Sequence, residues 1–270
     1  MRIWHQSFTV IEHLPAYTQR MAAHIARITR AGTEVVLHGV LPGTYPAAYP
    51  GDDLGHAALF ALHGQQWIVR AVQAEQEGFD AFAMCTLPNP MLREIRTLVD
   101  IPVVGYGEAS FHFASMLGHR FGLMMFIERM IPLYHEQIAQ YGLASRCASI
   151  CGAGFGFHDV VDGFTNPGPV LDRFRDTARR LIAAGADVIV PGEMPLNLLL
   201  ATEGVNRVDD VPVLDGLAVT LNLSECMVDL RRNTGLSASR NGWFGTAPRR
   251  ERVQELLHFY GLDRLGAPQH

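Results

Sequence analysis

The sequence predicts an α/β protein of two similar Rossmann-like domains with parallel sheets, related by a pseudo-twofold axis. Two observations predict this class. Short apolar runs alternate with helix-like segments of about ten or more residues, which is typical of βαβ units and a parallel sheet. In addition, one stretch occurs twice, as Gly78-Phe-Asp-Ala-Phe-Ala-Met-Cys-Thr86 and as Gly185-Ala-Asp-Val-Ile-Val-Pro-Gly-Glu193.

Both copies consist of a glycine, an aspartate two positions later, an apolar run and a polar residue. Glycine commonly follows a helix, and a short apolar run bounded by turn residues indicates a buried strand. Prolines then lead each copy into another helix. Because ligands bind at the carboxyl ends of parallel strands, we expect Thr86 and Glu193 at matching strand ends, with the site in the cleft between the two domains.

The first half of the chain is expected to contain strands at 2–5, 33–40, 78–86 and 103–104. Helices are expected at 15–30, 54–77, 90–99 and 108–117, because Pro15 suits a first helical position and Gly118 a position after the last one. The segment 41–53 holds three prolines and two glycines. It therefore predicts a surface loop long enough to cover a site.

The second half is expected to contain strands at 121–126, 147–150, 185–193 and 211–214, and helices at 128–141, 169–184, 217–232 and 249–260. The glycine-rich stretch 152–158 lacks the spacing of a dinucleotide fingerprint, which favours a flexible loop near the site. The long helix at 217–232 needs a partner in the first half. We therefore expect one domain from residues 1–118 plus 216–270 and a second from residues 119–215.

Composition excludes several classes of function. Hydrophobic residues make up 48% and charged residues 18% of the 270 positions, which indicates a globular protein. All 22 basic residues are arginine, so a lysine Schiff base, including pyridoxal phosphate attachment, and a P-loop are excluded. No pair of CxxC motifs and no HExxH motif occurs, and we expect no required metal.

The kind of partner follows from charge and hydropathy. A net charge of −5 gives no electrostatic footprint for nucleic acid or for an acidic membrane. No apolar run is long enough to cross a bilayer, and no signal-peptide core follows Arg2. We expect a cytoplasmic protein that acts on a small molecule, without nucleic acid or membrane partners, and its apolar content favours a homo-oligomer.

Several longer stretches carry a resemblance. They are Asp100-Ile-Pro-Val-Val-Gly-Tyr-Gly-Glu108, Leu117-Gly-His-Arg-Phe121, Glu128-Arg-Met-Ile-Pro132, Tyr141-Gly-Leu-Ala-Ser-Arg-Cys-Ala-Ser149 and Val211-Pro-Val-Leu-Asp-Gly216. Together with the repeated stretch, they resemble the hydantoin racemase branch of the aspartate/glutamate racemase superfamily. The resemblance implies a cofactor-independent enzyme with two similar α/β domains. It also implies that one cysteine from each domain moves the α-proton of the substrate.

The chain departs from that family at the residues that carry the chemistry. Thr86 and Glu193 stand where the family has its two catalytic cysteines, and Cys85 comes one residue early. Adjacent strand residues face opposite ways, so Cys85 should point away from the site unless a bulge turns it inward. The family's Asn-Pro-Asn-Thr-like turn is replaced by His5-Gln-Ser-Phe8, and its threonine pair by Met125-Phe126. These changes predict a more apolar pocket than a free amino acid would need.

Glu193 is the main candidate for catalysis. If it is buried, its pKa rises toward neutrality, which suits a general acid or base. Alternatively, its carboxylate satisfies backbone N–H groups at the start of a helix. The Thr86 hydroxyl could donate to a substrate oxyanion or simply cap a helix. Cys85 is a core residue or, if turned inward as a thiolate, a second catalytic group, and His5 is a candidate second proton carrier.

Further residues are candidates for substrate binding because they lie beside the predicted strand ends or in neighbouring loops. They are Gln6, Ser7, Gly192, Met194, Asp215, His158 and Arg129. Asp215 could orient a group in the site or cap the next helix. Arg129 could bind a substrate anion or lie solvated at the surface.

The function predicted from the sequence is a cofactor-independent racemase or isomerase. It would act next to a carbonyl of a small hydantoin-, amino-acid- or carboxylate-like substrate, with Glu193 as acid/base. Racemisation needs a competent group on both faces of the reacting carbon, and Thr86 is a poor one. A one-sided reaction is therefore the first alternative, either ring opening of a cyclic amide or lactone, or decarboxylation. The second alternative is a non-catalytic binding protein that retains the fold.

Overall fold

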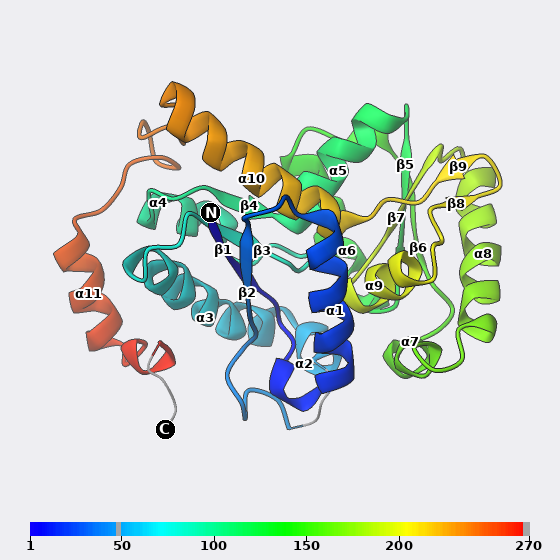
Figure 1. Cartoon of the computed structure of the whole chain (residues 1–270), viewed down its shortest axis with the longest axis horizontal. Coiled ribbons are helices and arrows are strands. Elements are labelled where there is room, and N and C mark those ends of the chain that lie inside the picture. The colour runs from blue at the N-terminus through cyan, green and yellow to red at the C-terminus, as the bar shows by residue number, and fades with distance from the viewer. Residues whose placement is uncertain (47–49, 267–270) are drawn as a thin grey trace.

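A computed structural model describes residues 1–46 and 50–266 of the chain. It contains two parallel sheets that lie next to each other (Figure 1). The first has the order β2-β1-β3-β4 and comprises β1 (Arg2–Gln6), β2 (Glu34–His38), β3 (Ala81–Met84) and β4 (Val103–Gly105). The second has the order β6-β5-β7 and comprises β5 (Phe121–Met125), β6 (Cys147–Gly152) and β7 (Val188–Pro191). The predicted α/β class with parallel sheets is confirmed.

Helices cover both sheets. Those that follow the strands of the first sheet are α1 (Pro15–Ile28), α2 (Gly51–Leu54), α3 (Ala57–Gln76), α4 (Leu92–Leu98) and α5 (Tyr106–Leu117). Those that follow the strands of the second sheet are α6 (Ile131–Gln140), α7 (Phe157–Gly163), α8 (Gly168–Ala183) and α9 (Met194–Thr202). The C-terminal part adds α10 (Gly216–Thr234) and α11 (Arg250–Phe259). Figure 1 shows α11 at the outer edge of the first sheet, far from the second.

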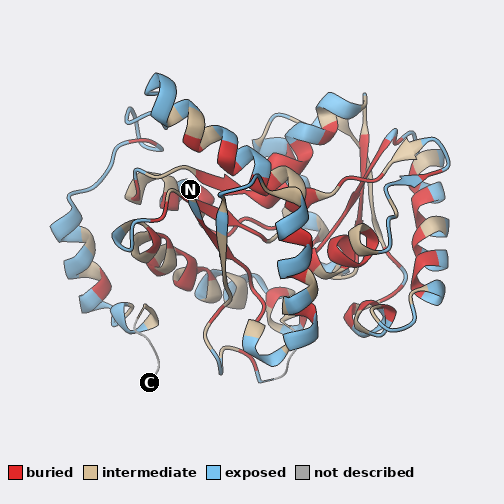
Figure 2. Cartoon of the chain, viewed as in Figure 1, coloured by how far each residue is buried: buried red, intermediate tan, exposed pale blue. Residues whose placement is uncertain are grey.

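Helix α10 returns to the first sheet, where it contacts α5, β3 and β4. It also contacts α1 and α9, and α5 contacts β7. The larger hydrophobic cluster accordingly extends from Trp4 and Phe82 in the first sheet to Phe121 and Val188 in the second. Figure 2 shows the inner strands as mostly buried, whereas the edge strands β2 and β6 are mostly intermediate. The two sheets are thus joined by a common apolar core, while the domain limits at 118 and 216 stay a prediction.

The repeated stretch has the same local structure in both copies. Gly78 and Gly185 follow α3 and α8 with φ of 75° and 95°, a left-handed conformation that favours glycine. The next residue in each copy donates its backbone N–H to a carbonyl in the last helical turn, Ala74 and Leu181 respectively, at 3.0 Å. The glycines therefore end the helices and turn the chain into β3 and β7.

The two aspartates of the repeat also share one role. Asp80 accepts a hydrogen bond from the backbone N–H of Arg2 at 2.7 Å, where β1 begins. Asp187 accepts from the backbone N–H groups of His119 and Arg120 at 2.8 and 2.7 Å, where β5 begins. Each carboxylate thus binds the start of the neighbouring strand, at the opposite end of the sheet from the predicted site.

A few expected elements differ in detail. The strand expected at 211–214 is mostly replaced by an antiparallel hairpin of β8 (Arg207–Val208) and β9 (Val211–Pro212), although Val213 still bridges to Ile189 in parallel. The glycine-rich stretch ends inside a helix, because α7 begins at Phe157. In the expected loop 41–53, residues 47–49 lie outside the described residues. No helix in the described part of the chain is long and apolar enough to cross a membrane.

Candidate active site

A largely apolar cavity of about 520 Å³, including its open mouth, lies where the carboxyl ends of β3 and β7 approach each other. It is lined by Ser7, Phe8, Thr9, Pro50, Leu54, Cys85, Thr86, Pro88, Phe126, Ile127, Met130, Tyr134, Phe157, Glu193, Met194 and Pro195. Residues that follow strands of both sheets therefore line the same cavity. Pro50, from the expected loop 41–53, and Leu54, at the end of α2, also line the cavity.

Glu193 lies two residues beyond β7, immediately before α9. Its Oε1 accepts a hydrogen bond from the backbone N–H of Ile127 at 2.9 Å, and its Oε2 accepts from that of Phe126 at 3.3 Å. Its backbone has φ of 66° and ψ of 136°, which is strained for a residue other than glycine. The local chain is thus turned so that the carboxyl reaches back across the end of β5.

The electrostatic environment of Glu193 suits proton transfer. Burial raises the pKa of Glu193 from 4.5 to about 8, and the hydrogen bonds from the Ile127 and Phe126 amides offset only part of this rise. Apolar side chains form most of the surrounding wall. A carboxyl with a pKa near 8 exchanges its proton readily around neutral pH, as a general acid or base requires.

Thr86 and Ser7 also line the cavity. Thr86 follows β3 as Glu193 follows β7, so the matching positions of the repeat meet at one cavity. Ser7 Oγ accepts a hydrogen bond from the backbone N–H of Thr9 at 3.3 Å, and its own O–H remains available as a donor. The two hydroxyls and the Glu193 carboxyl are among the polar groups that the sequence predicted for the site, and all three residues line the cavity.

Cys85 also lines this cavity but is fully buried and belongs to the hydrophobic core. Its backbone N–H donates to the Gln6 carbonyl at 2.7 Å, which continues the pairing of β3 with β1. Burial raises the pKa of the Cys85 thiol, and the hydrogen bond near Gln6 only partly opposes this. The thiol therefore stays protonated at neutral pH, which disfavours a role as base or nucleophile.

Six other predicted residues are not among the described residues that line the cavity. They are His5, Gln6, Gly192, His158, Arg129 and Asp215, the last of which belongs to a separate network described below. His5 is fully buried in β1, and burial, followed by the nearby His38, lowers its pKa to about 4. Gln6 turns to the core and accepts a hydrogen bond from Trp4 Nε1 at 3.0 Å. The His5 imidazole is therefore a weak base, because its pKa is so low.

Three of these residues, Gly192, His158 and Arg129, lie in other surroundings. Gly192 packs closely on β5, because a Cβ there would lie 2.3 Å from the Met124 carbonyl oxygen. His158 is exposed on α7. Arg129 is exposed, and its Nη1 lies 3.4 Å from His56 Nε2. Met194, by contrast, lines the cavity next to Glu193.

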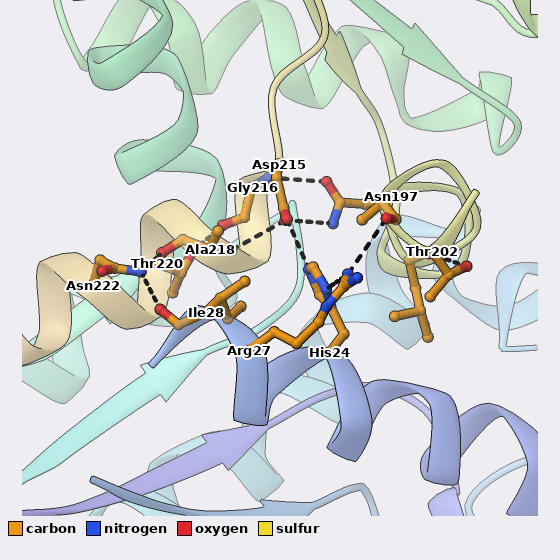
Figure 3. Close-up of polar contacts among 12 residues, drawn as sticks. His24, Arg27, Ile28, Asn197, Thr202, Asp215, Gly216, Ala218, Thr220 and Asn222 are labelled. Carbon is orange, nitrogen blue, oxygen red and sulfur yellow. Dashed lines mark hydrogen bonds and ion pairs between the residues drawn. The ribbon is translucent and has the colours of Figure 1, made fainter. Parts of the chain in front are cut away.

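Asp215 forms a separate polar network that joins α1, α9 and α10 (Figure 3). Its side chain accepts hydrogen bonds from Asn197 Nδ2 at 2.9 Å and from the backbone N–H of Ala218 at 3.1 Å, which caps α10. His24 Nε2 lies 2.7 Å from Asp215 Oδ2, and Arg27 Nη2 lies 2.7 Å from His24 Nδ1. Because a guanidinium only donates, His24 Nδ1 accepts and its Nε2–H donates to Asp215.

This network lines a second hollow, separate from the cavity at Glu193. Burial alone would raise the pKa of Asp215, but hydrogen bonds from His24, Asn197 and the Ala218 amide outweigh burial and lower it. Asp215 therefore stays ionised and connects the helices of both sheets. This geometry favours capping over contact with the substrate. Within the described residues, no three His, Cys, Asp or Glu side chains converge as a metal site would require.

The sequence did not identify Tyr134 in α6, or most of the apolar wall, as part of the site. Tyr134 is fully buried, and its hydroxyl has no hydrogen-bond partner among the described residues. One signal was present, because Met130, Tyr134 and Ile138 are spaced by four and form one buried helical face. That spacing predicts burial but does not show which sheet the face meets.

Comparisons with known proteins agree with this architecture. The Asp/Glu/hydantoin racemase family model matches residues 15–223. The chain is 28% identical to a hydantoin racemase of Pseudomonas sp. (strain NS671) over 163 residues, 60% of this chain and 64% of that protein, just under two thirds of its length. It is 26% identical to a hydantoin racemase of Paenarthrobacter aurescens over 226 residues, 83% of this chain and 91% of that protein.

Solved structures show the same fold. An allantoin racemase from Klebsiella pneumoniae superposes with a TM-score of 0.75 at 24% identity, over 92% of this chain and 94% of that one. An allantoin racemase from Pseudomonas fluorescens superposes with a TM-score of 0.73 at 25% identity, over 92% of this chain and 97% of that one.

Proposed function

The chain belongs to the Asp/Glu/hydantoin racemase family, and we propose that it moves a proton at a carbon next to a carbonyl, with Glu193 as the acid/base. The proposed substrate is a small hydantoin-like ring. Two relatives of similar sequence are hydantoin racemases, and two solved structures of similar fold are allantoin racemases. The observation that carries the proposal is the buried Glu193 carboxyl, with its pKa raised to about 8, in the wall of a cavity shared with Thr86 and Ser7.

The proposed chemistry has two steps. The ionised Glu193 carboxylate removes the proton next to the carbonyl, and the electron pair of the broken C–H bond moves into the carbonyl to form an enolate. Return of a proton to the same carbon completes an exchange. Hydroxyl groups of the cavity would stabilise the enolate oxygen, as preorganised donors do in other enzymes. Return of the proton to the opposite face would give racemisation.

A one-sided reaction is the second candidate, and Cys85 is the observation that favours it. Burial raises the pKa of the Cys85 thiol, and Thr86 is a weak base. Among the described cavity residues, Glu193 is therefore the one side chain suited to take a proton near neutral pH. Ring opening by a water that Glu193 activates, or decarboxylation, would need no second base.

The two candidates are separated by following one substrate in three ways. A single enantiomer of a 5-substituted hydantoin is incubated with the protein in D2O. Chiral chromatography reports racemisation, proton NMR reports exchange at C5, and mass spectrometry reports ring opening. Loss of optical purity without ring opening supports the proposed function, and ring opening without exchange supports the second candidate. Absence of all three across alkyl and aryl substituents contradicts the proposed function and the ring-opening candidate.

The matched variants for this assay are Glu193→Gln and Glu203→Gln. Glu203 is exposed at the end of α9 and lies outside the cavity wall. We expect Glu193→Gln to abolish turnover, because an amide cannot accept the proton, whereas Glu203→Gln should retain it. Equal activity of the two variants would remove Glu193 from the mechanism.

A further inference from the structure

We propose that the Tyr134 hydroxyl donates a hydrogen bond to the substrate carbonyl oxygen, and that the cavity selects a neutral cyclic amide over an anion. This inference rests on the proposed function and deepens it. It adds a residue that binds the substrate and stabilises its enolate. It also excludes ring-opened acids and free amino acids as preferred ligands.

The state of the Tyr134 hydroxyl is the first reason. Tyr134 is fully buried in α6, lines the cavity with Glu193, and has no hydrogen-bond partner for its hydroxyl among the described residues. A buried hydroxyl without a partner is destabilising, because it loses its hydrogen bonds to water. A substrate oxygen in the cavity would supply the missing acceptor. Because Tyr134 belongs to the cavity wall, we propose a bound substrate oxygen as the partner of this hydroxyl.

The protonation of Tyr134 is the second reason. Burial, and after it the negative charge of Glu193, raises the pKa of the Tyr134 phenol well above its ordinary value. The phenol consequently remains a neutral donor while Glu193 gains or loses its proton. A donor of this kind is suited to an enolate oxygen, which becomes a stronger acceptor as negative charge develops on it.

The occupied backbone amides are the third reason. Exposed N–H groups at a strand end or helix start commonly hold anions. At the end of β5, those of Phe126 and Ile127 already donate to the Glu193 carboxylate. In addition, no arginine or histidine belongs to the cavity wall within the described residues, and the chain has no lysine. An anionic substrate would therefore be buried without a side-chain cation to offset its charge.

The apolar part of the wall specifies the remainder of the ligand. Phe126, Phe157, Met130 and Leu54 belong to a wall that has few polar groups. An alkyl or aryl substituent on the ring would bury its apolar surface against this wall, which favours binding. The ligand class is thus a compact neutral ring with hydrogen-bonding oxygens at one side and an apolar substituent at the other.

The test compares two ligands that share one substituent. The probes are 5-benzylhydantoin, a neutral ring, and N-carbamoyl-phenylalanine, its ring-opened carboxylate, and their affinities are measured by titration calorimetry. We expect the wild-type protein to bind the ring at least about tenfold more tightly, since burying an unpaired charge is costly. Tighter binding of the carboxylate would overturn the inference.

Tyr134→Phe and Tyr45→Phe are the paired variants. Tyr45 is also buried with an unpartnered hydroxyl among the described residues, but it is not part of the cavity wall. We expect Tyr134→Phe to weaken binding of the ring about 3- to 10-fold, the effect of one hydrogen bond. Its kcat should fall by about 100-fold, the effect of losing one oxyanion donor. Tyr45→Phe should change neither constant.

Melting temperatures separate a binding role from a structural one. Removal of an unpartnered hydroxyl should leave the melting temperature of both variants equal to or above that of the wild type. A Tyr134→Phe protein that melts well below the wild type would contradict the inference, because its hydroxyl would then have a structural partner. If Tyr134→Phe turns over substrate at the wild-type rate, Tyr134 has no part in the reaction, and the proposed function still holds. Selective, Tyr134-dependent binding without turnover would contradict the proposed function alone.

Discussion

The Glu193 carboxyl accepts a hydrogen bond from the backbone N–H of Ile127 at 2.9 Å, so this residue, two positions after β7, is bound to the loop after β5. The sequence left two roles open for Glu193, an acid/base or a carboxylate that satisfies N–H groups at the start of a helix. The carboxyl makes no capping hydrogen bond to α9 but binds the amides after β5 and lies in the cavity wall, and its acid/base role stays a proposal. The second oxygen, Oε2, makes only the longer contact of 3.3 Å with Phe126. Its remaining lone pairs are where proton transfer would take place.

The pH dependence of turnover should report Glu193. Its pKa is raised to about 8, and the proposed base is the ionised form. The value of kcat/KM, which reports the free enzyme, should therefore increase about tenfold per pH unit up to about pH 8 and then level off. A profile that is flat from about pH 6 to pH 9 would show that Glu193 does not act as the base.

Thiol reagents should modify the protein without inactivating it. Cys226 is exposed on α10, whereas Cys85 is fully buried and its thiol pKa is raised. Iodoacetamide should alkylate Cys226 first, and peptide mass spectrometry would identify the site. Activity should persist after that reaction. Rapid inactivation accompanied by Cys85 labelling would indicate a thiolate at the site and restore a two-base mechanism.

Replacement of Asp215 should destabilise the protein and reveal how it links the two sheets. Asp215→Ala removes the cap of α10 and leaves His24 Nε2–H and Asn197 Nδ2 without their acceptor (Figure 3). We expect urea unfolding to show a loss of about 2–4 kcal/mol. Asp210→Ala, an exposed control, should change stability by less than about 0.5 kcal/mol.

At acid pH, the unfolding free energies of the wild type and Asp215→Ala should differ less. The folded-state pKa of Asp215 is lowered, so its contribution to stability is present above the unfolded-state pKa. It is lost as the pH falls through the folded-state value. A difference in unfolding free energy that stays constant into strong acid would contradict the assignment of an ionised Asp215.

Much of the fold followed from local chemistry. The repeated Gly-x-Asp stretch has one physical basis in both halves, because the glycine ends a helix and the aspartate binds the start of the adjacent strand. Periodicity and turn residues therefore predicted the parallel sheets. The hairpin of β8 and β9 was not predicted, since both strands have two residues and lack a distinct pattern.

The site was only partly predictable. The repeat placed Thr86 and Glu193 at equivalent strand ends, and both line the cavity. His5 and Gln6 were less predictable, because strand alternation does not show which face meets the core. Whether Tyr134 reaches the cavity wall depends on how α6 packs against the strand ends. Such contacts between distant segments carry no local pattern in the chain.

The most direct test of the Glu193 proposal is hydrogen–deuterium exchange at C5 of 5-benzylhydantoin in D2O, followed by proton NMR with wild type and Glu193→Gln. Exchange reports removal of the proton whether the product is racemised or not. We expect enzyme-dependent exchange by the wild type and a loss of at least about 100-fold in the variant, because the general base is removed. Exchange by a folded Glu193→Gln protein at the wild-type rate would contradict the proposal.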